Sequence, residues 1–208
     1  FGFDGDDKPA TLARLYEPEG IAFDRSAGFY IADTHNGRIR RVNASGQITT
    51  IAGTSDYGYN GDDQPATSAR LYGPRAIAFD RQSNLFIADA DNNRVRRVDV
   101  TGQITTVAGT GIPGYDGDDK PAISARISGP LSIAIDRSGN LYLTDQSRIR
   151  RVDAMGRITT VAGTGEDGYD EDNKPAATAR LNHPGGVAVD GSGNLYIADT
   201  NNHRVRRV

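Results

Sequence analysis

The sequence predicts an all-β fold, a β-propeller of four blades, because one strand-forming unit recurs four times within 208 residues. Prolines at the same point of each copy are separated by 56, 56 and 54 residues, at Pro18, Pro74, Pro130 and Pro184. A unit of this length, with four short strands and turns between them, is typical of one propeller blade. A single blade cannot bury both of its faces, so its neighbours must cover them.

The second copy shows the order of elements that we expect in each blade. Strands are predicted at residues 76–80, 85–89, 94–98 and 103–108, where β-branched, aromatic and small residues suit a half-buried sheet. The segments between them are rich in Asn, Asp, Ser and Gly, which favour turns. Before the first strand, acidic residues and a proline in residues 62–71 favour the first turn of a short helix.

The composition agrees with a turn-rich β protein, since the chain has 25 Gly, 9 Pro, one Met and no Trp. A net charge of −3 argues against a non-specific polyanion binder, so we expect no nucleic-acid partner. The absence of cysteine excludes disulfides and thiolate metal sites. No apolar run reaches the ~18 residues that a membrane-spanning helix needs, so we expect no membrane span.

The predicted third strand carries arginine on both faces, as in residues 204–208. We expect the arginine stems to cover apolar neighbours while the charged heads reach water. Each arginine strand follows a strand that ends in aspartate, so a hairpin brings acid and base together. Structural ion pairs are therefore favoured over a nucleic-acid surface. The expected pairs are Asp33 with Arg41, Asp89 with Arg97, Asp145 with Arg151, and Asp199 with Arg207.

We expect one propeller domain, residues 1–208, with repeats at 1–55, 56–111, 112–165 and 166–208. The third repeat lacks two residues in its hairpin, a loss that keeps the strand faces in register. The last blade lacks its outer strand, so its arginine strand is expected to form a sheet edge. Bare end faces predict self-association, or continuation into further blades.

The strand motifs resemble the NHL repeat family, in its bacterial type. Gly186-Val187-Ala188-Val189-Asp190, residues 194–199 and Asn202-His203-Arg204-Val205 carry the resemblance most clearly, and residues 146–149 of the third repeat depart most. The resemblance covers the whole chain and implies a β-propeller, commonly of six blades.

Two sets of loop residues are candidates for binding. The first is aromatic and stands beside acidic residues, so it can form a sugar or peptide platform or pack each loop onto its own blade. The second is acidic and can hold Ca²⁺ or cap the following Pro-Ala turn. Lys120 and Pro121 stand where a calcium loop needs Asp or Asn and then Gly. The residues are Tyr59, Tyr115 and Tyr169, with Phe3 at the same place, and Asp62, Asp63, Asp118, Asp119 and Asp172.

The three histidines, His35, His183 and His203, occupy different repeat positions and so do not form a ring suited to catalytic zinc. We expect no catalytic residues and no cofactor. The sequence favours a non-enzymatic scaffold for protein–protein or other extracellular interactions, in a secreted, periplasmic or cell-surface bacterial protein. The alternative is a carbohydrate-binding or enzymatic propeller, lyase- or hydrolase-like, that uses the loop tyrosines and aspartates at the channel mouth.

Overall fold

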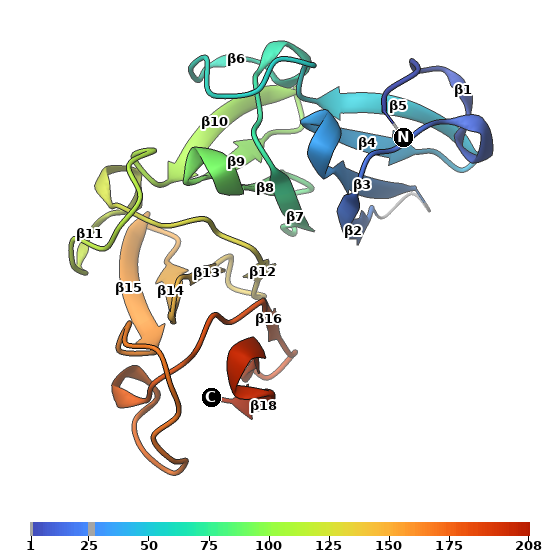
Figure 1. The fold of residues 1–208 in the computed structure, drawn as a ribbon. Helices are drawn as coiled ribbons and strands as arrows, with labels where there is room; N and C mark the ends of the chain where they lie inside the picture. Colours follow the sequence, from blue (N-terminus) through green and yellow to red (C-terminus); the bar gives the residue numbers. More distant parts are fainter. Residues whose placement is uncertain (1, 25–27) are drawn as a thin grey trace.

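The computed structural model describes residues 2–24 and 28–208, and in this part of the chain four antiparallel sheets follow one another along an arc (Figure 1). Each sheet lies within one repeat, and the strands Pro18–Phe23, Pro74–Phe79, Ile133–Ile135 and Gly186–Val189 lie toward the inside of the arc (Figure 1). The strands are β1 (Lys8–Pro9), β2 (Pro18–Phe23), β3 (Phe29–Asp33), β4 (Arg38–Val42) and β5 (Gln47–Ala52); β6 (Gln64–Pro65), β7 (Pro74–Phe79), β8 (Leu85–Asp89), β9 (Arg94–Val98) and β10 (Gln103–Ala108); β11 (Lys120–Pro121), β12 (Ile133–Ile135), β13 (Leu141–Asp145), β14 (Arg148–Val152) and β15 (Arg157–Ala162); β16 (Gly186–Val189), β17 (Leu195–Asp199) and β18 (Arg204–Arg207).

The predicted propeller fold with four blades is confirmed, and so is the strand order of the second repeat. The sequence missed one feature, a two-residue strand that pairs with the outer edge of the fourth strand in each of the first three sheets. In the first sheet this strand is β1, which gives the order β1-β5-β4-β3-β2. In the described part of the fourth sheet, β18 is the edge strand.

Side chains fix the tight turns between the third and fourth strands. Asp99 Oδ1 accepts hydrogen bonds from the backbone N–H of Thr101 and of Gln103, and from the Thr101 hydroxyl. Gly102 completes this turn with a φ of +83°, a conformation that suits glycine. Asn43 plays the role of Asp99 in the first blade, so an Asx residue sets these turns.

The Pro-Ala segments form single 3₁₀ turns rather than α-helical turns, and no side chain caps them, so the predicted aspartate caps are wrong. Proline begins each segment at an extended backbone angle, and the aspartates before it bond elsewhere, as described below. The turns are η1 (Ala10–Leu12), η3 (Ala66–Ser68), η5 (Ala122–Ser124) and η6 (Ala176–Thr178), and the hairpin connections form η2 (Thr34–Asn36), η4 (Ala90–Asn92) and η7 (Thr200–Asn202).

Three of the four hydrophobic cores in the described residues lie between blades, and the fourth lies within the first blade. One core joins Ile39 and Ala52 of the first blade to Ile77 and Ile87 of the second, with Leu71 between them. Two further cores join the second blade to the third and the third to the fourth. Each blade is therefore stabilised by burial against its neighbours, as expected for a repeat protein.

The two ends of the arc leave apolar positions bare. Ile21 is 63% exposed, whereas Ile77 and Ile133, at the same position of the next two blades, are each 7% exposed. At the other end Val205 is 75% exposed, and Val95 at the equivalent position is fully buried. The exposure follows from the arc, because no described residue of a neighbouring blade covers these positions (Figure 1).

Candidate functional site

The strands of each blade end on two opposite faces of the arc. The loop face carries the hairpin connections, such as residues 90–93, and the long loops after each fourth strand, such as residues 109–119. The turn face carries the tight turns, such as residues 80–84 and 99–102. The predicted loop tyrosines and aspartates belong to the long loops that lead from one blade into the next.

A buried arginine organises the second blade. Arg96 is fully buried, and its Nη2 donates to Asp62 Oδ1 at 2.9 Å and to the carbonyl oxygen of Gly61 at 2.9 Å. Its Nη1 lies 3.7 Å from Asp89 Oδ2. Thr106 also donates to Asp62 Oδ1, at 3.0 Å. One cation thus ties the long loop to the middle strands, and we call Arg96, Asp62, Asp89 and their equivalents the arginine cluster.

The strand-end aspartate of this cluster anchors the hairpin. Asp89 Oδ1 accepts from the backbone N–H of Tyr72 at 2.7 Å, and Oδ2 accepts from Asn92 Nδ2 at 2.8 Å. Asp89 is fully buried, and burial raises its pKa to about 6, against these hydrogen bonds and the nearby Arg96. Asn92 also donates to the carbonyl oxygen of Gly58, so hairpin and loop are held together.

The loop aromatic residue stacks on arginines of its own blade. The Tyr59 ring centroid lies 3.8 Å from Arg94 Cζ and 4.9 Å from Arg96 Cζ. Such cation–π contacts hold the loop on the blade and favour the packing interpretation over an open ligand platform. The same stacking joins Phe3 to Arg38, Tyr115 to Arg148, and Tyr169 to Arg204.

The expected ion pairs were assigned to the wrong arginines. Asp33 pairs with Arg40, at 3.5 Å, and Arg41 instead contacts Asp24 at 3.1 Å. Side chains alternate between sheet faces, so Arg40 shares the face of Asp33 while Arg41 points to the other. In the other blades the arginine partners of Asp89, Asp145 and Asp199 are likewise Arg96, Arg150 and Arg206, while Arg97, Arg151 and Arg207 lie opposite Phe86, Tyr142 and Tyr196.

The prediction that arginine heads reach water is also wrong for three of them, since Arg40, Arg96 and Arg150 are fully buried. A buried cation needs compensating charge, and the loop aspartate together with the strand-end aspartate supplies it. The sequence pattern of alternating strand faces did not reveal this, because the loop aspartate lies more than 30 residues away in the sequence.

The acidic loops do not fit a calcium ion. Asp62, Asp118 and Asp172 each hold an arginine guanidinium, at 2.9, 2.8 and 2.9 Å. Asp63 and Asp119 have left-handed backbone angles that shape the loop. Their backbone N–H groups donate hydrogen bonds to the carbonyl oxygens of Ile104 and Ile158, respectively. No three His, Cys, Asp or Glu side chains gather as metal ligands in residues 2–24 and 28–208.

One small polar cluster on the loop face is specific to the third and fourth blades. The Ser147 hydroxyl donates to Asp167, and His183 Nε2 lies 3.6 Å from the other Asp167 oxygen. The serine thus contacts the carboxylate directly rather than the imidazole. This order differs from a relay in which histidine removes the serine proton, so the cluster lacks the arrangement of an activated nucleophile.

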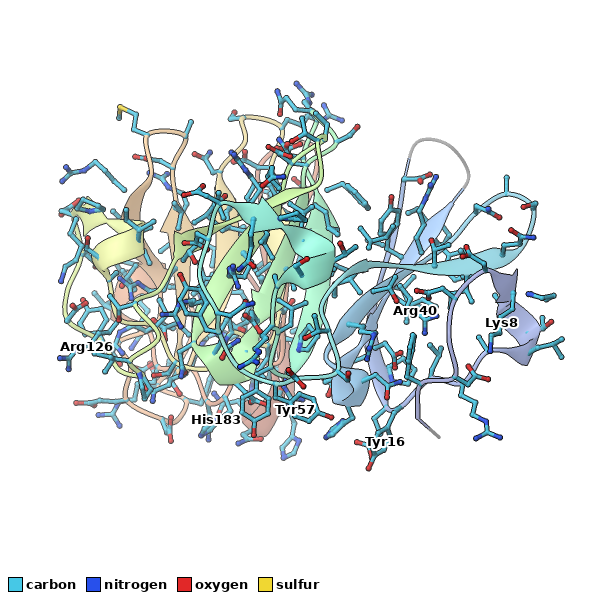
Figure 2. All side chains as sticks on the ribbon, turned by 90° about the horizontal axis from the view of Figure 1, so that it is seen from above. Lys8, Tyr16, Arg40, Tyr57, Arg126 and His183 are labelled. Carbon is cyan, nitrogen blue, oxygen red and sulfur yellow. The ribbon has the colours of Figure 1, made fainter. Side chains whose placement is uncertain are left out.

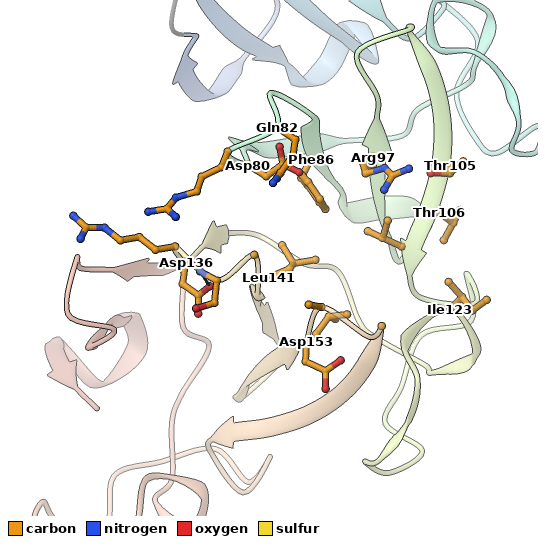
Figure 3. A pocket seen from close by; sticks show the side chains of 18 residues that line it. Asp80, Gln82, Phe86, Arg97, Thr105, Thr106, Ile123, Asp136, Leu141 and Asp153 are labelled. Atoms are coloured by element: carbon orange, nitrogen blue, oxygen red, sulfur yellow. Dashed lines mark hydrogen bonds between the residues drawn. The ribbon is translucent and has the colours of Figure 1, made fainter.

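A cleft of about 650 Å³ opens on the turn face between the second and third blades (Figure 3). Arg97 and Phe86 line one side, and Asp136 and Leu141 line the other. Asp136 accepts hydrogen bonds from Ser138 and Asn140 within its own turn, and these donors lower its pKa despite partial burial. The cleft is large enough for a small ligand, but the three aspartates that line it, Asp80, Asp136 and Asp153, each accept backbone hydrogen bonds within their own turns.

Three tyrosines that sequence reasoning missed, Tyr16, Tyr57 and Tyr72, lie close to His35 on the loop face, where Figure 2 places Tyr16 and Tyr57 along one edge. The ring centroids of Tyr16 and His35 are 5.1 Å apart, and those of Tyr57 and Tyr72 are 5.5 Å apart. The Tyr57 hydroxyl donates to the carbonyl oxygen of His35 at 2.7 Å, which joins the pairs. The sequence signal for this group is a difference between repeats. The first two repeats have Tyr16 and Tyr72 at one position, where the third and fourth have Ser128 and Asn182.

Repeated four-stranded units arranged around an axis, with inter-blade cores, define a β-propeller. Residues 181–208 match the family described as NHL repeat, and residues 113–167 match the one described as Teneurin NHL domain. Teneurin-4 of Mus musculus is 33% identical over 97% of this chain, and Teneurin-3 of Danio rerio is 32% identical over 98%. The chain spans 8% of the length of each of these relatives.

The chain belongs to the NHL-repeat β-propellers, as the strand motifs predicted. Its bacterial type stays a prediction. Among solved structures, a protein of unknown function from Bacteroides thetaiotaomicron has a TM-score of 0.73 at 22% identity, covering 92% of this chain and 47% of that one. An auxiliary nutrient binding protein from Bacteroides ovatus has a TM-score of 0.71 at 24% identity, covering 94% of this chain and 49% of that one. A streptogramin B lyase has a TM-score of 0.58 at 17% identity, covering 92% of this chain and 51% of that one. At these identities the similarity shows the fold alone.

Proposed function

We propose that this chain is a non-enzymatic NHL-repeat scaffold that binds a protein partner outside the cell, through the loop face. The repeated polar residues of that face are already used within the blades, since Asp62 and Asp118 each hold a buried arginine. These carboxylates therefore serve the fold. They are poorly placed to act as a catalytic acid or base, which would have to reach a substrate.

The observation that carries the proposal is the pair of exposed tyrosines that the repeat does not require. Tyr57 and Tyr72 are 51% and 45% exposed, lie side by side on the loop face, and have no aromatic equivalent in the third or fourth repeat. Tyrosine is enriched among the residues that contribute most to protein interfaces. An extracellular location is part of the proposal and is compatible with a chain that has no cysteine.

The test compares two faces of the same molecule. A photo-crosslinking phenylalanine analogue replaces Tyr57 on the loop face or Met155 in a turn on the opposite face. We expect saturable crosslinking to one protein of the source organism from position 57 only, and 1:1 binding when that protein is purified. Equal labelling from both positions, or turnover abolished by one loop-face substitution, would contradict the proposal.

A second candidate is carbohydrate binding at the repeated loop tyrosines, favoured by the partial exposure of Tyr59, Tyr115 and Tyr169 at 38–42%. The fold neighbour named as an auxiliary nutrient binding protein agrees with it at the level of fold. Glycan-array binding that is lost in Tyr115→Ala and Tyr169→Ala, with the fold retained, would favour this candidate. Unchanged binding in those variants would remove it.

A further inference from the structure

The aromatic group of Tyr16, His35, Tyr57 and Tyr72, which we call the tyrosine patch, departs from the repeat at several positions at once. Pro113 and Asp167 stand where Tyr57 stands, and Asp91 and Asn201 stand where His35 stands. The fold does not need aromatic residues at these positions, because the other blades form without them. Their concentration at the junction of the first two blades therefore needs another explanation.

The patch is held in a defined arrangement. Tyr57 packs against Gly37, where a Cβ atom would lie 3.3 Å from the ring, and Asn93 and His203 occupy the equivalent position elsewhere. The hydrogen bond from the Tyr57 hydroxyl to the His35 carbonyl fixes the ring from its other end. The glycine makes room for the tyrosine, and both features belong to the first two blades. A preorganised aromatic surface loses little entropy on binding.

Carboxylates surround the patch. Glu17 Oε2 lies 3.2 Å from His35 Nδ1 and its side chain is 63% exposed. The Asp91 carboxylate lies over Gly73, next to Tyr72. Asp56, beside Tyr57, is paired with Arg70 at 3.1 Å. With Arg70 offsetting Asp56, two carboxylates remain beside the rings, and the electrostatic potential of the patch favours a cation.

We propose that the tyrosine patch binds an arginine- or lysine-bearing segment of a protein partner, with the cation between the tyrosine rings and the carboxylates of Glu17 and Asp91. This rests on the proposed function and names the chemistry of the partner. An exposed tyrosine face attracts a cation through its ring quadrupole, and a nearby carboxylate adds charge attraction. An acidic segment would meet like charge, and a purely apolar one would leave these carboxylates unused.

The molecule contains its own control. The Tyr115 ring already has Arg148 of the same blade at 3.9 Å, so its cation site is filled. With ¹³C-labelled tyrosine rings, we expect N-acetyl-arginine amide to shift the NMR signals of Tyr57 and Tyr72 in a saturable manner, and to leave that of Tyr115 unchanged. The neutral isostere N-acetyl-citrulline amide should bind about fivefold more weakly or not at all.

Substitutions taken from other repeats provide matched variants. Tyr57→Pro and Tyr72→Ser introduce the residues of the third repeat and should abolish the shifts of the remaining patch rings. Glu17→Gln and Asp91→Asn should weaken binding several-fold without loss of fold. Equal binding of the arginine and citrulline probes, or no shift at saturating probe, would overturn the proposal. Either result leaves the crosslinking test of the proposed function to be judged on its own.

Discussion

Arg150 donates directly to Asp145 in the third blade, with 2.9 Å between Nη1 and Oδ2. The same two atoms are 3.7 Å apart in the Arg96–Asp89 pair of the second blade. The shortened hairpin explains the difference, because Gln146 stands two residues before the arginine strand, where the other blades have the asparagine that donates to this carboxylate oxygen. The arginine has taken over a hydrogen bond that the deleted loop residues no longer supply.

This relationship predicts different costs for two equivalent substitutions. Arg96→Met leaves a buried carboxylate and should lower the free energy of unfolding by about 3–5 kcal/mol. Arg150→Met should cost about 1 kcal/mol more, because Asp145 then keeps only the backbone N–H of Ser128. Urea unfolding of both variants, with exposed Arg126→Ala as the control, tests the prediction. Equal losses would show that the shorter contact has no energetic consequence.

The protein should be most stable at mildly acidic pH. Burial raises the pKa of Asp89 to about 6, so the folded state holds this proton more tightly than the unfolded chain does. Protonated Asp89 therefore stabilises the folded state below its ordinary pKa near 4, and this stabilisation is lost as the pH rises through about 6. The melting temperature should therefore fall between pH 5 and pH 7, and Asp89→Asn should flatten that part of the curve.

The aspartates of the tight turns change the stability of the fold in the opposite sense, at lower pH. A hydrogen bond from Thr101 lowers the pKa of Asp99, and one from Asn194 lowers the pKa of Asp190. Their contribution is present above the ordinary value of 3.8 and is lost as the pH falls through the lowered values. Stability should decline below about pH 4. A melting temperature that keeps rising down to pH 2 would contradict this account.

The end faces predict self-association of the isolated chain. Ile21 and Phe23 are 63% and 74% exposed at one end, and Val205 is 75% exposed at the other. Soluble monomers seldom expose such patches, and near-identical blades make the end of one copy complementary to the start of another. Sedimentation at micromolar concentration should show dimers or larger species, and Ile21→Glu should shift them toward monomer.

A compact, monodisperse 22.3 kDa species in the unsubstituted chain would contradict the self-association prediction. Exposed Tyr115→Phe is a suitable control, because Phe3 stands at the same position of the first repeat and the substitution leaves both end faces unchanged.

Much of the fold could be predicted because strand patterns are local. The aromatic, β-branched and small residues within 85–89 and the turn residues around Asp99 act over a few positions, and the regular proline spacing shows that this local pattern recurs. The two-residue strand β6 was missed because Gln64 and Pro65 show no strand pattern and pair only once the long loop has folded back onto β10.

The site was harder to predict because its contacts are distant in sequence. Asp62 meets Arg96 across 34 residues, and only the folded loop shows that this carboxylate is occupied. The tyrosine patch brings Tyr16, His35, Tyr57 and Tyr72 together from two repeats. A search for repeated residues finds those that stabilise each blade, such as the loop aromatic residues. The tyrosine patch is formed by residues that the third and fourth repeats lack, so such a search does not find it.

The central claim is that the loop aromatic residue present in all four repeats serves the fold, and that Tyr57 and Tyr72, which have no aromatic equivalent in the third and fourth repeats, serve binding. Thermal unfolding of Tyr115→Ala beside Tyr57→Pro tests it most directly. We expect Tyr115→Ala to lose its stacking on Arg148, about 1 kcal/mol, and to lower the melting temperature by about 2–4 °C. Tyr57→Pro removes a half-exposed ring and its hydrogen bond to the His35 carbonyl, and should lower the melting temperature by less than Tyr115→Ala does. An unchanged midpoint for Tyr115→Ala together with a lowered one for Tyr57→Pro would contradict the account.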